Sequence, residues 1–243
     1  MRRPVQTLLL ALTGAGLLHA ALFTDLYLRY VKAGLRPPLI ASGAVLLLLA
    51  LAQAAVRHRL SGDPGHEHGH DHTGTPRVAW LLFLPALSLL LYAPPALGAY
   101  TAARASSKPV AAQKKGFAPL PAASPLPLTL TDFTRRVQQD RSRAVGSRTV
   151  RLTGFVTPAG EDGGWYLTRI IFTCCAADSQ TVKVRMYGTE APPADTWLAV
   201  TGTWHPHGTL GTGTAQAALD VREATPVAQP VNAYTDDLPL TPS

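Results

Sequence analysis

The 243-residue sequence has few cysteines, and its first half has few acidic side chains. Its two cysteines are adjacent, Cys174 and Cys175. Neighbouring cysteines rarely bond to each other, because a disulfide needs Cα atoms further apart than one trans peptide allows. An intrachain disulfide framework is therefore excluded. The sequence also lacks a Ser-His-Asp arrangement, a phosphate-binding glycine loop and a paired-carboxylate signature, so we do not expect an enzyme.

Charge is distributed unevenly along the chain. Residues 1–115 contain twelve basic and four acidic side chains, a net charge of +8, whereas the remainder is near −1 and the whole chain is +7. The bases flank apolar segments, as membrane anchoring requires, and do not cluster on a folded domain. We therefore expect contact with a lipid bilayer and no binding of nucleic acid.

Three apolar segments predict a membrane region over residues 1–100. The predicted spans are residues 5–24, 39–56 and 78–98, each close to the roughly 20 residues that cross a bilayer core. The first segment is also similar to a cleaved signal peptide, but we favour an uncleaved helix because a second span follows closely. Its small residues predict a face suited to packing against another helix: Ala11, Gly14, Ala15 and Gly16.

A histidine-rich loop, residues 57–77, lies between the second and third predicted spans. Neutral imidazole is a common ligand for zinc, copper and nickel, and carboxylates add oxygen ligands. We interpret this loop as a metal collector. The alternative is a solvated linker whose histidines only buffer protons. The candidate ligands alternate along the loop and are His66, Glu67, His68, His70, Asp71 and His72.

A Pro- and Ala-rich linker over residues 101–130 precedes a predicted second domain, residues 131–243. A helix is expected to begin at Thr131 or Asp132, to run toward Val145 and to end at Gly146. Five strands are then predicted over residues 149–156, 165–175, 181–187, 197–204 and 217–224, from apolar–polar alternation in the first and third and from an aromatic and β-branched run in the second. The predicted fold class is membrane α plus β: N-terminal transmembrane helices followed by a small antiparallel OB-like β-barrel.

The cysteine pair allows three interpretations. The first is a thiolate metal site with Asp178, joined by His205 and His207. The second is a redox-active pair, and the third is plain packing of two small apolar side chains. Successive strand residues face opposite sides, so both thiols share one site only if the chain turns at the pair. Arg169, in an apolar strand, needs a partner, for which Asp178 is the candidate.

Several short motifs resemble the YcgQ-type family of bacterial membrane proteins. The motifs that carry the resemblance are Lys115-Gly116-Phe117, Leu130-Thr131-Asp132-Phe133, Gly154-Phe155, Tyr166-Leu167-Thr168-Arg169, Cys174-Cys175-Ala176-Ala177-Asp178 and Trp197-Leu198-Ala199-Val200-Thr201-Gly202. The resemblance implies N-terminal helices, a histidine-rich loop and a C-terminal β-domain with a C-x-A-D signature. It carries over the residues Arg169, Cys175 (or Cys174) and Asp178. It also implies a subunit of a permease, a separate multi-span permease as partner, and a link to zinc.

The leading functional hypothesis is an accessory subunit of a membrane permease complex that handles a divalent metal, zinc. One alternative is a membrane-anchored thiol redox protein or metallochaperone that uses Cys174 and Cys175. Another is a membrane-anchored binding module without a metal role. The positive-inside rule does not fix the orientation. With the resemblance, we expect a multi-pass protein of the bacterial cell membrane with the histidine-rich loop in the cytoplasm and the C-terminal domain outside it.

Overall fold

The computed structural model describes residues 3–60, 96–105, 110–113, 116–160, 163–231 and 233–238. The chain divides into two compact units, one of Met1–Tyr27 and Ala33–Ala96, the other of Leu28–Lys32 and Leu97–Ser243. The predicted metal loop, residues 66–72, and most of the predicted third span, residues 78–98, lie outside the described residues.

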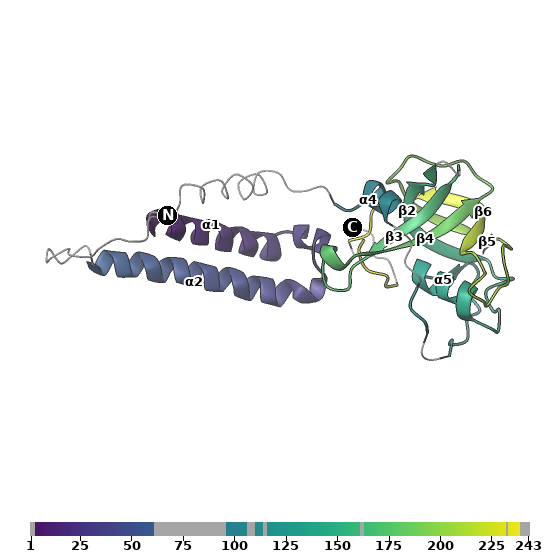
Figure 1. The fold of residues 1–243 in the computed structure, drawn as a ribbon, viewed down its shortest axis with the longest axis horizontal. Coiled ribbons are helices and arrows are strands. Elements are labelled where there is room, and N and C mark those ends of the chain that lie inside the picture. Colours follow the sequence, from purple (N-terminus) through teal and green to yellow (C-terminus); the bar gives the residue numbers. More distant parts are fainter. Residues whose placement is uncertain are drawn as a thin grey trace. The chain divides into compact units, whose positions relative to one another are not determined.

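Two apolar helices account for the described part of the first unit. They are α1 (Arg3–Leu22) and α2 (Arg36–Leu60), joined through the short 3-10 helices η1 (Leu26–Arg29) and η2 (Ala33–Leu35). The apolar stretches Val5–Leu22 and Ala33–Val56 are each long and apolar enough to cross a membrane by length and composition. The helices pack side by side as an antiparallel pair (Figure 1).

A contact between two glycines lets α1 and α2 approach closely. A Cβ atom on Gly14 would lie 2.9 Å from the carbonyl oxygen of Gly43, and one on Gly43 would lie 2.9 Å from Cγ of Leu18. Near the end of α1, the carbonyl oxygen of Ala21 accepts a hydrogen bond of 2.8 Å from Nε of Arg36. The predicted small-residue face is therefore confirmed at Gly14, whereas Gly16 faces open space.

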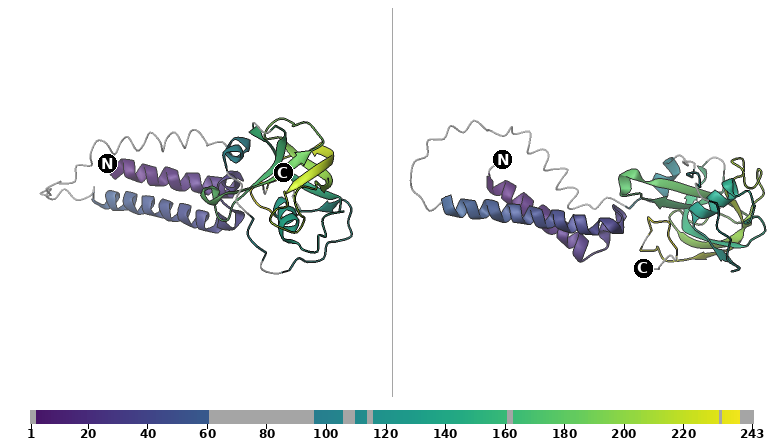
Figure 2. Two further views of the ribbon diagram at one scale, coloured as in Figure 1. Left: turned by 45° about the vertical axis from the view of Figure 1, so that its right-hand side comes forward. Right: turned by 90° about the horizontal axis from the view of Figure 1, so that it is seen from below.

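The second unit contains one mixed sheet of six strands, drawn in Figure 2 from two further directions. The strand order is β1-β2-β3-β4-β6-β5, with an additional pairing of β2 with β5. The pairs β1–β2 and β4–β6 are parallel and the others antiparallel, so the predicted all-antiparallel arrangement was wrong for these two pairs. The strands are β1 (Leu126–Pro127), β2 (Val150–Pro158), β3 (Trp165–Ile171), β4 (Gln180–Tyr187), β5 (Trp197–Trp204) and β6 (Ala218–Pro226).

Two α-helices in the described part of the second unit accompany the sheet. The first, α4 (Ala99–Arg104), contacts β2 and β3 and was not predicted. The second, α5 (Leu130–Gln139), begins after Thr129, whose hydroxyl accepts a hydrogen bond of 3.0 Å from the Asp132 amide. The prediction that this helix runs to Val145 was wrong. It ends at Gln139, and the carboxylate of the next residue, Asp140, accepts hydrogen bonds from the amide and hydroxyl of Ser142 and so stabilises a turn.

A core of large apolar side chains lies between α5 and the strands. Its fully buried members include Phe133, Val137, Leu152, Trp165 and Leu219. Burial of one such side chain stabilises the fold by roughly 1.5–3 kcal/mol. These residues come from α5 and from strands β2, β3 and β6. The core therefore holds β3 in place, and the candidate site follows the end of that strand.

Candidate functional site

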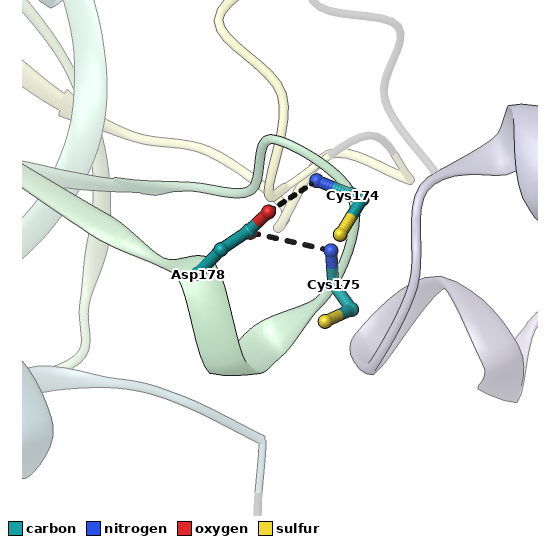
Figure 3. Close-up of side chains that lie close together, drawn as sticks. All are labelled: Cys174, Cys175 and Asp178. Atoms are coloured by element: carbon teal, nitrogen blue, oxygen red, sulfur yellow. Dashed lines mark hydrogen bonds between the residues drawn. The ribbon is translucent and has the colours of Figure 1, made fainter.

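The cysteine pair lies in a tight turn between β3 and β4, which we call the Cys turn (Thr173 to Asp178). β3 ends at Ile171, earlier than the predicted residue 175, and the 3-10 helix η5 (Ala176–Asp178) follows the pair. The Asp178 carboxylate accepts hydrogen bonds from the amides of Cys174 (2.7 Å) and Cys175 (3.2 Å) (Figure 3). It also accepts one from the Thr173 amide (2.9 Å). This carboxylate therefore stabilises the turn by accepting hydrogen bonds from three consecutive backbone amides.

Residues Tyr30 to Lys32 form backbone hydrogen bonds with the Cys turn. Val31 and Cys175 form an antiparallel bridge. The Lys32 amide donates to the carbonyl oxygen of Cys174 at 3.0 Å, and the Ala176 amide donates to that of Tyr30 at 2.8 Å. These three residues belong to the same compact unit as the sheet, although they precede it by more than sixty residues in the chain. The Cys turn is thus clamped through its backbone, and its thiols stay available for chemistry.

The turn brings three ligands of different softness together. One atom from each of Cys174, Cys175 and Asp178 lies within 4.8 Å of the other two (Figure 3). Around one zinc ion, with Zn–S bonds near 2.3 Å, two tetrahedral ligand atoms would be about 3.8 Å apart. A contraction of about 1 Å would therefore suffice for a shared ion. The predicted condition that the chain must turn at the pair is met.

Hydrogen bonds within the turn shift the protonation of its members. The pKa of Cys174 is raised to about 11, chiefly by its hydrogen bond to the Asp178 carboxylate and next by that to Cys175. The same thiol, and then the backbone amides, lower the pKa of Asp178. The turn therefore holds a carboxylate beside a protonated thiol. A divalent cation that displaced the proton would neutralise the two adjacent negative charges.

The structure separates the predicted histidine ligands from the cysteines. His205 stacks on Tyr187 with ring centroids 4.0 Å apart, and its Nδ1 lies 2.7 Å from the Asp220 carboxylate. Tyr187 ends β4, whereas the Cys turn precedes the first residue of that strand, Gln180. The seven residue steps along β4 span about 23 Å. The predicted five-ligand set is therefore divided: Cys174, Cys175 and Asp178 gather, and His205 and His207 lie elsewhere.

Arg169 lies buried within β3 and has a different environment from the one we expected. Its Nη2 donates to the carbonyl oxygen of Thr235, and its guanidinium lies 5.0 Å from the centroid of the Trp197 ring. Burial lowers its pKa to about 10, against the opposing charges of Asp236 and Asp237. The expected pair with Asp178 was wrong, because that carboxylate accepts the amides of the Cys turn instead.

The segment around Asp236 was missed at the sequence level. Tyr234 stacks on Phe172 at 4.5 Å, and its carbonyl oxygen accepts the Phe172 amide at 3.0 Å. Burial raises the pKa of Asp236, against the opposing effects of the neighbouring Thr131, Thr129 and Arg169 side chains. The acidic pair Asp236-Asp237 was the signal that could have identified a partner for Arg169.

Residues 133–235 match the family model of the DUF1980 C-terminal domain. This region contains most of α5, strands β2 to β6 and the whole Cys turn. No curated protein and no solved structure matches the chain.

Proposed function

We propose that the chain is a membrane-anchored accessory subunit of a permease complex that binds a divalent metal, zinc, at the Cys turn. The observation that carries this proposal is the convergence of Cys174, Cys175 and Asp178 within 4.8 Å. Two thiolates and one carboxylate form a donor set suited to zinc, and a fourth position stays open for water or for a ligand from a partner. The histidine-rich loop, residues 66–72, supplies further imidazole ligands by sequence.

The raised pKa of Cys174 argues against thiol redox chemistry at the turn. A reactive thiol needs a lowered pKa, because the thiolate is the nucleophile. The pKa of Cys174 is instead raised to about 11. A metal ion drives the loss of the proton and gains two anionic ligands, so its affinity increases with pH.

The backbone pairing of residues Tyr30 to Lys32 with the Cys turn supports a three-span topology. Residues 28–32 follow the first apolar helix, so they lie on the side of the membrane opposite the N-terminus if α1 spans it. The β-domain follows α2 and the predicted span 78–98. The β-domain lies on the same side as residues 28–32 only if the chain crosses the membrane an even number of times after residue 32. α2 and the predicted third span together satisfy this condition and place the histidine-rich loop on the other side.

The remaining support comes from the architecture. Both α1 and α2 are apolar along nearly their whole length and bring few polar groups to line a pore, so transport would need a multi-span partner. The resemblance to the YcgQ-type family favours a permease partner, a cytoplasmic histidine-rich loop and an extracytoplasmic β-domain. The pairings of β2 with both β3 and β5 connect the strands β2-β3-β4-β6-β5 in a ring, which favours the OB-like barrel.

Zinc titration of the full chain in detergent tests the metal site. We compare the wild type with a Cys174→Ala/Cys175→Ala variant, a His66→Ala/His68→Ala/His70→Ala/His72→Ala variant, and a His205→Gln/His207→Gln control. Each of the first two variants should lose one class of bound zinc, and the control should lose none. Unchanged zinc binding in the double cysteine variant would remove the metal site from the proposal.

Two further measurements test topology and partner. In a Cys174→Ala/Cys175→Ala background, a new thiol at the exposed position 151 (Arg151→Cys) should be labelled by a membrane-impermeant maleimide applied to intact cells. A protease site inserted in the histidine-rich loop should be cut only after lysis. Labelling and cleavage from the same side would exclude the three-span topology. Purification from native membranes with mass spectrometry should recover a multi-span protein. Recovery of the chain alone would contradict the permease assignment.

A further inference from the structure

Strand β4 has one edge without a neighbouring strand over residues 180–184. β4 pairs with β3 from Gln180 to Met186, but in the described part of the chain it pairs with β6 only at Arg185, Met186 and Tyr187. The Arg185 amide donates to the carbonyl oxygen of Ala217 at 2.9 Å, so it points away from β3. We call residues 180–184 on this side the open edge.

The alternation of a β-strand places hydrogen-bonding groups on the open edge. In an antiparallel pair, every second residue directs its amide and carbonyl groups toward the partner strand. Since Arg185 directs its amide away from β3, Thr181 and Lys183 direct theirs away from β3 as well. Neither residue forms a backbone hydrogen bond outside the sheet among the described residues. Two residues, about 6.6 Å apart, therefore each present an unpaired backbone donor and acceptor.

The open edge lies along a groove formed by two adjoining cavities. Their volumes are about 560 Å³ and about 300 Å³, and Val110, Thr181 and Val182 line both of them. Lys183 lines the larger cavity, and α5 contributes residues to both linings. The unpaired backbone groups of the edge are therefore next to space that the fold leaves unfilled.

The groove holds a stretch of the chain's own linker, Val110 to Gln113, which we call the linker segment. The Gln139 carboxamide donates through Nε2 to the carbonyl oxygen of Val110 at 3.4 Å, and its Oε1 accepts the Gln113 amide at 2.8 Å. Nζ of Lys183 donates to the carbonyl oxygen of Ala105 at 3.1 Å. All three bonds go to backbone atoms, as in recognition of a peptide. The linker segment forms no β-bridge with β4 among the described residues, so the open edge stays unpaired.

We propose that the open edge binds an extended segment of a partner protein, which adds to the sheet as one further strand. A β-strand presents donors and acceptors at every second residue, and it therefore matches the spacing of Thr181 and Lys183. The linker segment lies in the groove without pairing to β4, so the occupant is a segment of another sequence and not the linker of a second copy.

The side chains along the open edge define the sequence of such a segment. Val182 belongs to the core, so the partner residue opposite it would be apolar. Lys183 is the one charged residue that lines the larger cavity, so the partner residue opposite it would be acidic. Its ammonium group has three donors, of which one goes to Ala105. The partner segment therefore alternates apolar residues with polar ones and has a carboxylate at its centre.

The probe is a fluorescein-labelled pentapeptide, Thr-Val-Glu-Val-Thr, titrated into the full chain in detergent and followed by fluorescence anisotropy. Replacement of its glutamate by glutamine should weaken binding about three- to tenfold, because a hydrogen bond between charged groups contributes more than a neutral one.

Two methylated peptides test the backbone pairing without any change in the protein. In an antiparallel alignment the glutamate amide of the peptide donates to the carbonyl oxygen of Lys183. N-methylation of this amide should weaken binding about tenfold or more, because it removes the donor and places a methyl group against β4. N-methylation of the following valine, whose amide points away from β4, should have little effect.

A pair of variants tests the open edge itself. Thr181→Pro removes an amide that takes no part in the ladder with β3, and it should weaken binding of the pentapeptide about tenfold or more. Thr181→Ala keeps the amide and should bind like the wild type. The melting temperatures of both variants report whether the domain still folds.

A second pair tests competition by the linker segment. Gln139→Ala removes both hydrogen bonds that hold Val110 and Gln113, so it should strengthen binding of the pentapeptide about three- to tenfold. Gln138→Ala is the matched control, because Gln138 lines the same cavity but forms no hydrogen bond with the linker segment among the described residues. The control should bind like the wild type.

The proposal is overturned if the pentapeptide does not bind at millimolar concentration, or if the two methylated peptides bind equally well. Equal binding by Thr181→Pro and Thr181→Ala, or no gain in Gln139→Ala, would place the peptide outside the groove and also overturn it. If the peptide Val-Ala-Ala-Gln bound as tightly as the probe, the occupant would be the linker of a second copy and not a partner. The proposal does not depend on the metal site, and zinc should not change the affinity for the pentapeptide.

Discussion

The two units of the chain differ in the burial of their large apolar side chains. In the β-domain, Trp165 and Phe133 are fully buried, whereas Leu48 and Leu51 on α2 are 64% and 65% exposed. The β-domain thus contains its own core. Among the described residues, the helix pair buries little beyond its contact seam. A bilayer would provide the apolar environment that its outer surface lacks. The difference supports the proposal of a membrane anchor joined to an independently packed domain.

The largest expected effect comes from the core of the β-domain. Phe133→Ala should reduce the free energy of unfolding by about 3–5 kcal/mol, because it removes buried contacts and leaves a cavity. Leu48→Ala, on the exposed surface of α2, should change it by less than about 0.5 kcal/mol. Denaturant unfolding in detergent, followed by near-UV circular dichroism, measures both. Equal effects at the two positions would contradict the comparison.

A smaller loss is expected at Arg169, the buried cation of the same domain. Arg169→Met removes the hydrogen bond to Thr235 and the contact with Trp197, and it takes a positive charge away from Asp236. We expect about 2–3 kcal/mol of destabilisation in the same unfolding assay. Arg151→Met, at an exposed position of β2, is the matched control and should have no measurable effect. If Arg169→Met proved neutral, the guanidinium would have no structural role.

The seam of the helix pair should be sensitive at one glycine and tolerant at another. Gly14→Leu places a side chain against Gly43 and Leu47, at a cost of about 1–3 kcal/mol. Gly16→Leu, two residues further along the same helix, meets no atom within 4 Å and should be tolerated. Amide hydrogen exchange of α1 and α2 reports the difference. Faster exchange in Gly16→Leu than in Gly14→Leu would show that the helices pair through another face.

The smallest expected effect on folding, but a clear one on reactivity, lies at the Cys turn. A Cys175→Ser variant keeps a hydrogen-bond acceptor at position 175 of the turn. The pH dependence of the alkylation rate of Cys174 in this variant should show a raised pKa, as in the native turn, where the pKa is about 11. Asp178→Asn should shift that profile toward the ordinary thiol value of about 8.5. Because the folded-state pKa is the higher one, the protonated thiol stabilises the turn below the ordinary value. This stabilisation is lost as the pH rises toward 11. A profile insensitive to Asp178→Asn would exclude the hydrogen bond.

Much of the fold was predictable because its signals are local. The strand Trp197–Trp204 coincides with the predicted range, since a run of apolar and β-branched residues lies between two tryptophans. β3 was predicted too long because its apolar run continues into the turn, where Asp178 takes the backbone amides of the pair. The short strand β1 contains Pro127 in a proline-rich linker, and its pairing with β2 depends on a distant contact.

The candidate site was predictable only in part. The spacing of Cys174, Cys175 and Asp178 suggested a turn, because those residues are close in sequence. His205 and His207 could not be placed, because their distance from the cysteines depends on strand register along β4 and β6. The clamp by residues 30–32 and the groove along β4 likewise join segments far apart in the chain, for which one sequence gives no signal.

The most direct measurement of the central claim is the electronic spectrum of the Co²⁺-loaded full chain, because thiolate-to-cobalt charge transfer reports sulfur ligation. We predict a near-ultraviolet charge-transfer band in the wild type and in the variant that lacks His66, His68, His70 and His72. The band should disappear in Cys174→Ala/Cys175→Ala. A spectrum that is unchanged by loss of both cysteines, or that has no sulfur band at all, would contradict a metal site at the Cys turn.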